Sequence, residues 1–151
     1  MDEALELQRG MRVLEVGAGS GYHAATIAEI VGEQGQVFAI EYLDKLVTTA
    51  RTNLARIGYA NRVTLVEGDG SLGYPHRGPY DRILVTAAAP GIPPPLLSQL
   101  KPEGIIVIPV GGRMFPQELI KVKKKADGTL QRESLGGVAF VPLVGKHGFS
   151  H

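Results

Sequence analysis

Residues 12–21 read RVLEVGAGSG, a short apolar strand followed at once by glycines at alternate positions. Residues 22–31 then place Ala24, Ile27 and Val31 on one face of a helix. A strand, a glycine-rich turn and a helix in this order form the first half of a βαβ unit. The turn of such a unit lies at the carboxyl end of a parallel strand, where open α/β sheets bind their ligands. This stretch therefore predicts both a fold and the place of a binding site.

The rest of the chain repeats the alternation of short apolar runs and helical periods. We expect parallel strands at residues 12–16, 36–40, 63–66, 82–86 and 105–110. The predicted helices cover residues 22–31, 43–57 and 96–100, and the last of them opens on prolines. This pattern indicates an α/β fold with a Rossmann-like, doubly wound and mostly parallel sheet.

An antiparallel hairpin is expected at the C-terminal end of the sheet, with strands at residues 118–125 and 130–135. The Asp-Gly pair at 127–128 is typical of a primed hairpin turn. Residues 138–143 are expected to extend the last strand past a bulge at the Gly-Gly pair 136–137.

The composition is that of one ordinary soluble domain, with 151 residues, a net charge of +1 and no cysteine. A nucleic-acid partner is not expected, because such domains are usually strongly basic. We interpret the lysines between residues 121 and 125 as charges that prevent an exposed edge strand from pairing with the edge of another sheet. No apolar run approaches the roughly 20 residues that span a bilayer. The start of the chain is acidic, unlike a signal peptide. We therefore predict a cytoplasmic protein without a membrane partner.

The first residues of the chain resemble the end of an element. Met1, Ala4 and Leu5 have helical spacing, as in the last turns of a helix whose start is absent. Residues 1–151 are accordingly expected to form a single domain that is truncated at its N-terminus. Residues 111–116 read as a loop, so we expect a thinly covered sheet with an apolar face that favours self-association.

The acid before the glycines indicates which ligand the turn accepts. The spacing of Gly17, Gly19 and Gly21 is G-x-G-x-G, whereas the dinucleotide fingerprint is G-x-G-x-x-G. The carboxylate of Glu15 would repel a pyrophosphate but would suit an ammonium group. S-adenosylmethionine carries an ammonium group and no phosphate. The alternative is that these glycines serve only tight packing of strand against helix.

Two further acids follow the next two strands. Glu41 stands at the tip of the second strand, where an acid commonly accepts hydrogen bonds from ribose hydroxyls; the alternative is a helix cap, a position better filled by Asp44. Asp69 lies between two glycines, so its carboxylate could accept from an adenine amino group while the Gly70 amide lies near the ring. The alternative for Asp69 is a tight Asp-Gly turn.

Several of these stretches resemble one enzyme family. Residues 14–22, LEVGAGSGY, resemble the first motif of S-adenosylmethionine-dependent methyltransferases, and residues 67–70, EGDG, resemble their adenine motif. Residues 79–90, PYDRILVTAAAP, resemble protein-L-isoaspartate O-methyltransferases in particular, as do IPVG at 108–111 and FVPL at 140–143. The resemblance covers nearly the whole chain.

The resemblance implies a class I methyltransferase fold, S-adenosylmethionine as cofactor and methyl transfer to the α-carboxylate of L-isoaspartyl residues in damaged proteins, as a step of protein repair. The residues expected to bind the cofactor are Glu15, Gly17, Gly19, Gly21, Glu41, Asp69 and Gly70. The residues expected to bind the isoaspartyl substrate are Thr86, Ala87 and Ala88, whose small side chains would leave backbone groups free to pair with an extended peptide.

No catalytic residue is assigned, because the family's hydroxyl residue lies in an N-terminal Ser-x-Pro-His stretch that this chain lacks. A carboxylate with a pKa of about 4 is ionised at neutral pH and needs no general base. The histidines lack metal-ligand spacing, so no metal is expected, and His23 is read as a polar surface residue. We expect Tyr22 to pack either near the cofactor or in the core. The remaining alternatives are a methyltransferase for a small molecule or RNA, and a non-catalytic cofactor-binding remnant.

Overall fold

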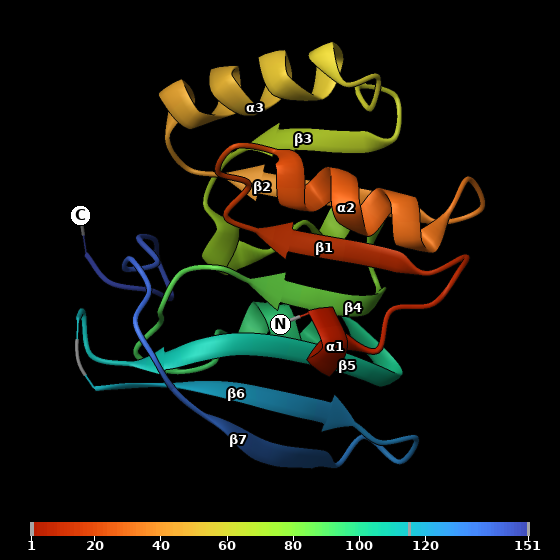
Figure 1. Ribbon diagram of the computed structural model, residues 1–151. Coiled ribbons are helices and arrows are strands. Elements are labelled where there is room, and N and C mark those ends of the chain that lie inside the picture. Colours follow the sequence, from red (N-terminus) through yellow and green to blue (C-terminus); the bar gives the residue numbers. More distant parts are fainter. Residues whose placement is uncertain (1, 115, 151) are drawn as a thin grey trace.

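The computed structural model describes residues 2–114 and 116–150 and has one seven-stranded sheet (Figure 1). Its strands are β1 (Arg12–Val16), β2 (Gln36–Glu41), β3 (Val63–Glu67), β4 (Tyr80–Val85), β5 (Leu100–Gly111), β6 (Gln117–Lys124) and β7 (Leu130–Val138). Its helices are α1 (Asp2–Leu5), α2 (Tyr22–Val31), α3 (Asp44–Arg56) and α4 (Pro94–Ser98), with short 3₁₀ turns η1 (Gly70–Leu72) and η2 (Pro75–Arg77). The order is β3-β2-β1-β4-β5-β6-β7, with β1 to β5 parallel and both pairings of β6 antiparallel, which confirms the predicted fold class.

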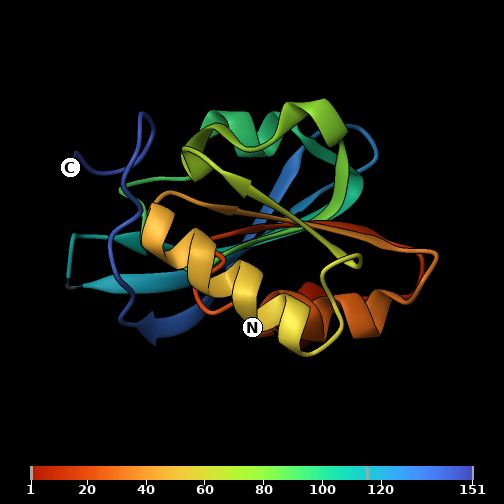
Figure 2. The same ribbon diagram turned by 90° about the horizontal axis from the view of Figure 1, so that it is seen from above.

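The helices form layers on both faces of the sheet, as the view from above shows (Figure 2). α1, α2 and α3 lie on one face, and α4 lies with η1 and η2 on the other. The inner strands therefore contribute to two cores, because successive side chains of a strand point to opposite faces. In β1, for example, Val13 packs beneath α2 while Leu14 and Val16 join the core under α4.

The sheet order places a switch point between β1 and β4. From β1 the chain builds outward through β2 to β3, and it then returns to place β4 and β5 on the other side of β1. The connections that leave β1 and β4 thus diverge, which opens a crevice beyond their carboxyl ends. Val16 and Val85, the last residues of these strands, lie side by side in the register. The glycine turn and residues 86–88 therefore meet at this edge.

The predicted helix boundaries are confirmed for α2 and nearly so for α3, but α4 begins and ends earlier than expected. It spans Pro94–Ser98 rather than 96–100, because prolines fill its first turn and Leu100 already begins β5. α1 packs against β4 and β5, and Met1, which was predicted to belong to it, lies outside the described residues. None of the helices in the described ranges is long and apolar enough to cross a membrane.

The hairpin turn between β6 and β7 is not the predicted primed turn. The N–H of Gly128 donates to the oxygen of Lys125 (2.9 Å), and φ is positive at Gly128 (88°) but not at Asp127. The loop is thus a three-residue type I turn completed by a left-handed glycine. The side chain of Asp127 accepts from the N–H of Thr129 (2.9 Å), which stabilises this form. β7 is exposed along nearly its whole length, and part of the sheet is thinly covered as expected.

The C-terminal segment, which we define as residues 139–150, departs from the predicted strand extension. The bulge near Gly136 is confirmed by a register shift opposite Glu118 and Ile120, but β7 ends at Val138. The segment then runs back across the carboxyl edge of the sheet toward β3 (Figure 1). The ladder ends there because β6 begins at Gln117, which pairs with Val138, and the segment makes an isolated parallel bridge between Pro142 and Ala88 instead.

Candidate functional site

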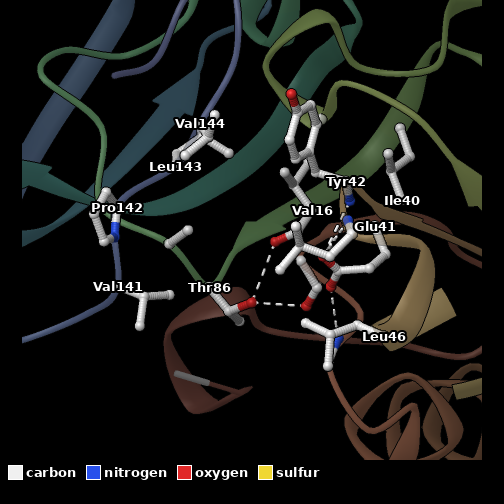
Figure 3. Close-up of a pocket in the computed structure, with 15 residues that line it drawn as sticks. Val16, Ile40, Glu41, Tyr42, Leu46, Thr86, Val141, Pro142, Leu143 and Val144 are labelled. Atoms are coloured by element: carbon white, nitrogen blue, oxygen red, sulfur yellow. Dashed lines mark hydrogen bonds between the residues drawn. The ribbon is translucent and has the colours of Figure 1, made fainter. Parts of the chain in front are cut away.

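A pocket of about 320 Å³ lies beyond the carboxyl ends of β1, β2 and β4, beneath the C-terminal segment (Figure 3). Its walls are mostly apolar, with a carboxylate and backbone groups between them, and its size is within the range of small-molecule sites. The residues that line it are Val16, Gly17, Gly19, Ile40, Glu41, Tyr42, Leu43, Leu46, Gly70, Thr86, Ala87, Val141, Pro142, Leu143 and Val144.

The glycine turn is held against the ends of β2 and β4. The N–H of Gly17 donates to the oxygen of Ile40 (2.8 Å), and the hydroxyl of Thr86 donates to the oxygen of Gly17 (2.8 Å). A Cβ atom on Gly17 would lie 2.6 Å from that hydroxyl oxygen, so the turn closes only with glycine there. Gly19 differs, because a Cβ atom on it would meet no heavy atom within 4 Å. Its backbone borders open space in the pocket.

Gly21 does not line the pocket, although it was predicted to bind the cofactor. A Cβ atom on Gly21 would lie 3.1–3.2 Å from the backbone and side chain of Ala50 on α3. This glycine therefore allows the first turn of α2 to pack against α3. Gly21 therefore serves close packing, which was the alternative to ligand binding, whereas Gly17 and Gly19 line the pocket.

Glu41 lies at the pocket as predicted and is 7% exposed. One carboxylate oxygen accepts from the N–H of Gly19 (3.0 Å), and the other accepts from the N–H groups of Tyr42 (3.0 Å) and Leu43 (3.3 Å). The side chain thus links the glycine turn to the start of α3. It lies where a ribose ligand was predicted, and it also accepts hydrogen bonds from backbone N–H groups just before the helix, as a capping residue does. Carboxylate oxygens have about four acceptor positions, so capacity remains for a ligand hydroxyl.

Asp69 and Gly70 have different surroundings. Gly70 lines the pocket, and a Cβ atom on it would lie 2.3 Å from Val16. Asp69 is not among the lining residues, and its carboxylate accepts hydrogen bonds from Ser71 and from the backbone of Lys146. A contact between Asp69 and adenine stays a prediction.

The substrate residues lie at the exit of β4, but one expectation about them is wrong. Thr86 and Ala87 line the pocket. Ala88 is fully buried and already paired: its N–H donates to Val141 (2.7 Å), and its oxygen accepts from the N–H of Leu143 (2.7 Å). The C-terminal segment thus occupies the backbone edge that was expected to be free for a peptide. The physical reason is that buried backbone groups must be paired within the fold.

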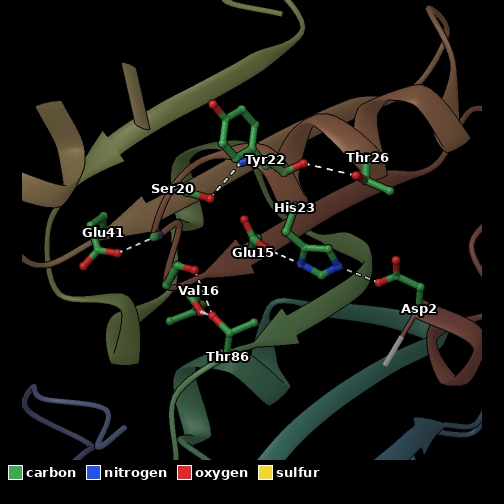
Figure 4. Close-up of polar contacts among 11 residues, drawn as sticks. Asp2, Glu15, Val16, Ser20, Tyr22, His23, Thr26, Glu41 and Thr86 are labelled. Carbon is green, nitrogen blue, oxygen red and sulfur yellow. Dashed lines mark hydrogen bonds and ion pairs between the residues drawn. The ribbon is translucent and has the colours of Figure 1, made fainter. Parts of the chain in front are cut away.

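A polar cluster beside the glycine turn was missed in the sequence (Figure 4). The two ring nitrogens of His23 lie 2.8 Å from Glu15 and 2.7 Å from Asp2. Burial raises the pKa of the Glu15 carboxyl, while the hydrogen bond to Glu15 raises the pKa of His23 to about 9. His23 is thus a partly buried bridge rather than a surface residue. The available signal was helical geometry, since α2 lies over the face of β1 that carries Glu15.

Glu15 itself is 1% exposed and is not among the residues of the pocket. Among the described residues, its Oε1 is the one buried side-chain polar atom that lacks a hydrogen-bond partner. Such an atom costs free energy unless something pairs with it. The predicted contact with an ammonium group therefore remains a prediction, and this unpaired oxygen favours it.

A family model described as protein-L-isoaspartate(D-aspartate) O-methyltransferase matches residues 1–148. The chain belongs to this family. A protein-L-isoaspartate O-methyltransferase of Methanosarcina mazei is 54% identical over 99% of the chain, and one of Hyperthermus butylicus is 53% identical over 99%. The chain spans 60% and 64% of the lengths of these two relatives.

Solved structures of isoaspartate O-methyltransferases have the same fold. One superposes with a TM-score of 0.84 at 38% identity, covering 97% of this chain and 46% of that one. Another, a protein from Plasmodium falciparum described as being in complex with S-adenosyl-L-homocysteine, superposes with a TM-score of 0.80 at 25% identity over 91% of this chain and 67% of that one. The class I methyltransferase architecture predicted from the sequence is thereby confirmed.

Proposed function

We propose that the chain binds S-adenosylmethionine and transfers its methyl group to the α-carboxylate of L-isoaspartyl residues in damaged proteins. The observation that carries this proposal is the pocket at the β1–β4 switch point, in a chain that belongs to the isoaspartate O-methyltransferase family. The pocket combines a buried carboxylate, a glycine cradle and apolar walls, as a nucleoside requires.

The residues present fit the cofactor part by part. Glu41 would accept from the ribose hydroxyls, and Gly70 would let the backbone approach the base. Gly17 and Gly19 would border the amino-acid part, and we propose that the unpaired oxygen of Glu15, which precedes the glycine turn in β1, accepts from its ammonium group. The apolar walls would exclude water from these contacts.

For this reaction the protein mainly has to align the acceptor carboxylate with the methyl group of the cofactor. The bound cofactor supplies an electrophilic methyl group on a sulfonium, and an ionised carboxylate attacks it without a general base. Thr86 and Ala87 border the pocket at the end of β4, and we propose that they position the acceptor there. Alignment of two reactants can contribute on the order of 7–11 kcal/mol to catalysis. A catalytic hydroxyl is not part of this proposal.

The test is transfer of an isotopically labelled methyl group from S-adenosylmethionine to an isoaspartyl peptide and to its normal aspartyl twin. We expect label in the isoaspartyl peptide alone, lost by mild base as expected for an ester. Equal labelling of both peptides would contradict the substrate assignment. Cofactor binding measured by calorimetry without any transfer would favour the cofactor-binding alternative. The cytoplasmic location stays a prediction from the sequence.

A further inference from the structure

The carboxylate of Glu15 is buried near the end of β1, one residue before the pocket wall begins at Val16. Its Oε2 lies 2.8 Å from Nδ1 of His23, whereas its Oε1 has no hydrogen-bond partner within the described ranges. A buried carboxylate oxygen without a partner is costly. This oxygen therefore indicates a donor that comes from outside the chain.

Negative charge is concentrated around this carboxylate. Glu41 lies at the tip of β2, the strand that pairs with β1, and is itself 7% exposed. Burial is the main cause that raises the pKa of Glu15, and the charges of Asp2 and Glu41 raise it further. His23 acts in the opposite direction, through its hydrogen bond and its positive charge. The two buried carboxylates thus favour a second cation at this point, in addition to His23.

The ring of His23 is held from two sides (Figure 4). Its Nδ1 contacts Glu15 and its Nε2 lies 2.7 Å from Asp2 of α1. α1 is in turn held against β4, because the guanidinium of Arg82 donates to backbone oxygens at the end of this helix. The orientation of the Glu15 carboxylate therefore depends on α2 through the ring, and on α1 through Asp2.

The cluster lies next to the end of the pocket that Gly17 and Thr86 border. Thr86 lines the pocket and also an open hollow whose other lining residues are Asp2, Glu3 and His23. Figure 4 shows one oxygen of Glu15 toward the ring and the other away from it. A hydrogen bond to one oxygen restricts the rotation of a flexible glutamate side chain, and it thereby fixes the place of the other oxygen.

We propose that His23 is a positioning residue that orients the Glu15 carboxylate, so that its second oxygen accepts from the ammonium group of the cofactor. This inference rests on the proposed function for the identity of the ligand. His23 acts through Glu15 and does not itself contact the ligand, and Asp2 supports the ring from its other side.

Two ligands separate this role from a general effect on the pocket. S-adenosylhomocysteine carries an amino-acid part with an ammonium group, whereas methylthioadenosine has the same adenosine and sulfur without that part. Loss of the orientation of Glu15 should weaken binding of the first ligand alone. A general disturbance of the pocket would weaken both, because both would use the part bordered by Glu41 and Gly70.

Two substitutions of His23 form a matched pair. His23→Leu removes the donor to Glu15, whereas the amide nitrogen of His23→Asn can lie near the place of Nδ1 and donate to the same oxygen. The asparagine should therefore recover most of the binding that the leucine loses. The control is Thr26→Ala, which removes an exposed hydroxyl that donates to the oxygen of Tyr22 within α2.

Calorimetry on the 151-residue chain measures the binding of both ligands. His23→Leu should raise the dissociation constant of S-adenosylhomocysteine by about tenfold and that of methylthioadenosine by less than about twofold, since one hydrogen bond to a charged group is lost with the first ligand. Thr26→Ala should match the unaltered chain with both ligands.

Nuclear magnetic resonance of the unaltered chain gives a second measurement, which decides the matter if His23→Leu does not fold. The signals of the His23 ring nitrogens should shift when S-adenosylhomocysteine binds, because its ammonium group would share the carboxylate of Glu15 with the ring. They should stay nearly unchanged when methylthioadenosine binds.

Equal effects of His23→Leu on the two ligands would overturn the inference, and so would a His23→Asn variant that binds no better than His23→Leu. Equal shifts of the ring signals with both ligands would contradict it as well. These outcomes leave the proposed function intact, because the unaltered chain still binds the adenosyl ligands. If the unaltered chain binds neither ligand, the proposed function fails and the inference fails with it.

Discussion

At the scale of single residues, Glu41 and Gly19 together shape the polar side of the pocket. The N–H of Gly19 donates to the carboxylate of Glu41, so the turn and the acid form one unit. The sequence located both, since a strand tip and a glycine turn are recognisable from local pattern. It did not show that Gly21 packs against α3, because that depends on which helix lies opposite.

Replacement of Glu41 by alanine should weaken binding of S-adenosylhomocysteine by about 1–3 kcal/mol, the usual effect of losing a charged hydrogen-bond acceptor. The reason is its buried place at the pocket, next to the glycine turn. Calorimetry measures the change, with circular dichroism as a check on the fold. Glu67→Ala is the control, because Glu67 is an exposed acid at the tip of the neighbouring strand. An unaltered dissociation constant for Glu41→Ala would remove the ribose assignment.

Gly19→Val should leave the fold largely intact while abolishing cofactor binding. The Cβ position is open, so the side chain meets no protein atom but enters the space beside the pocket. The φ angle of 53° is in the left-handed region, which adds a cost of about 1–2 kcal/mol for a residue other than glycine. Thermal unfolding with and without S-adenosylhomocysteine tests both statements. Stabilisation by the ligand equal to that of the unaltered chain would show that this glycine is structural only.

At the scale of elements, His23 joins α2 to both β1 and α1. Its ring lies between Glu15 of β1 and Asp2 of α1, so one side chain links three elements (Figure 4). From the sequence, His23 was expected at the surface, because its place in the first turn of α2 does not by itself show that Glu15 and Asp2 lie against it. Long-range polar contacts of this kind need the packing of the helices on the sheet to be known first.

The stability that His23 contributes should depend on pH. Its pKa is raised from 6.5 to about 9 in the folded chain, so the contribution is complete below pH 6.5 and is lost as the pH rises through about 9. We expect His23→Gln to destabilise the chain near pH 6 by about 1 kcal/mol, a modest figure because the ring is partly exposed to water. Urea denaturation at pH 6 and pH 10 measures the difference.

His76→Gln is the control, since His76 is an exposed histidine in η2 on the opposite face. The gap in stability between His23→Gln and the unaltered chain should narrow at pH 10, whereas the control should show no such trend. A gap of the same size at both pH values would argue against a charged His23.

At the scale of the whole molecule, the fold class and most strands and helices were predicted from the sequence, but the strand order and the path of the C-terminal segment were not. Periodicity reports whether a stretch is a strand or a helix, and it carries no information on where an irregular segment returns. For the same reason, the pairing of Ala88 with this segment was not foreseen, and the backbone edge there was expected to be free. The pocket was thus predicted without one of its walls.

We expect the side chain of Gln117 to contribute strongly to holding the C-terminal segment in place. Gln117 is 3% exposed, and its side-chain amide makes the two hydrogen bonds to the backbone of Phe140 that a neighbouring strand would otherwise make. Gln117→Ala removes the hydrogen bonds to the partly buried backbone N–H and oxygen of Phe140 and should cost about 1–3 kcal/mol in the free energy of unfolding. Urea denaturation tests this against Gln131→Ala, a glutamine on the exposed strand β7. Equal stability of the two variants would mean that Phe140 finds other partners.

The order in which the molecule assembles follows from the long return of the C-terminal segment. The bond between Asp69 and Lys146 joins positions 77 residues apart, and the central pairing of Val13 on β1 with Arg82 on β4 also joins positions that are distant in sequence. The entropy of loop closure changes slowly with loop length, so it does not separate these two contacts, but the bond to Lys146 also needs the C-terminal segment. During synthesis, the pocket should stay incomplete until the C-terminal segment, residues 139–150, has emerged.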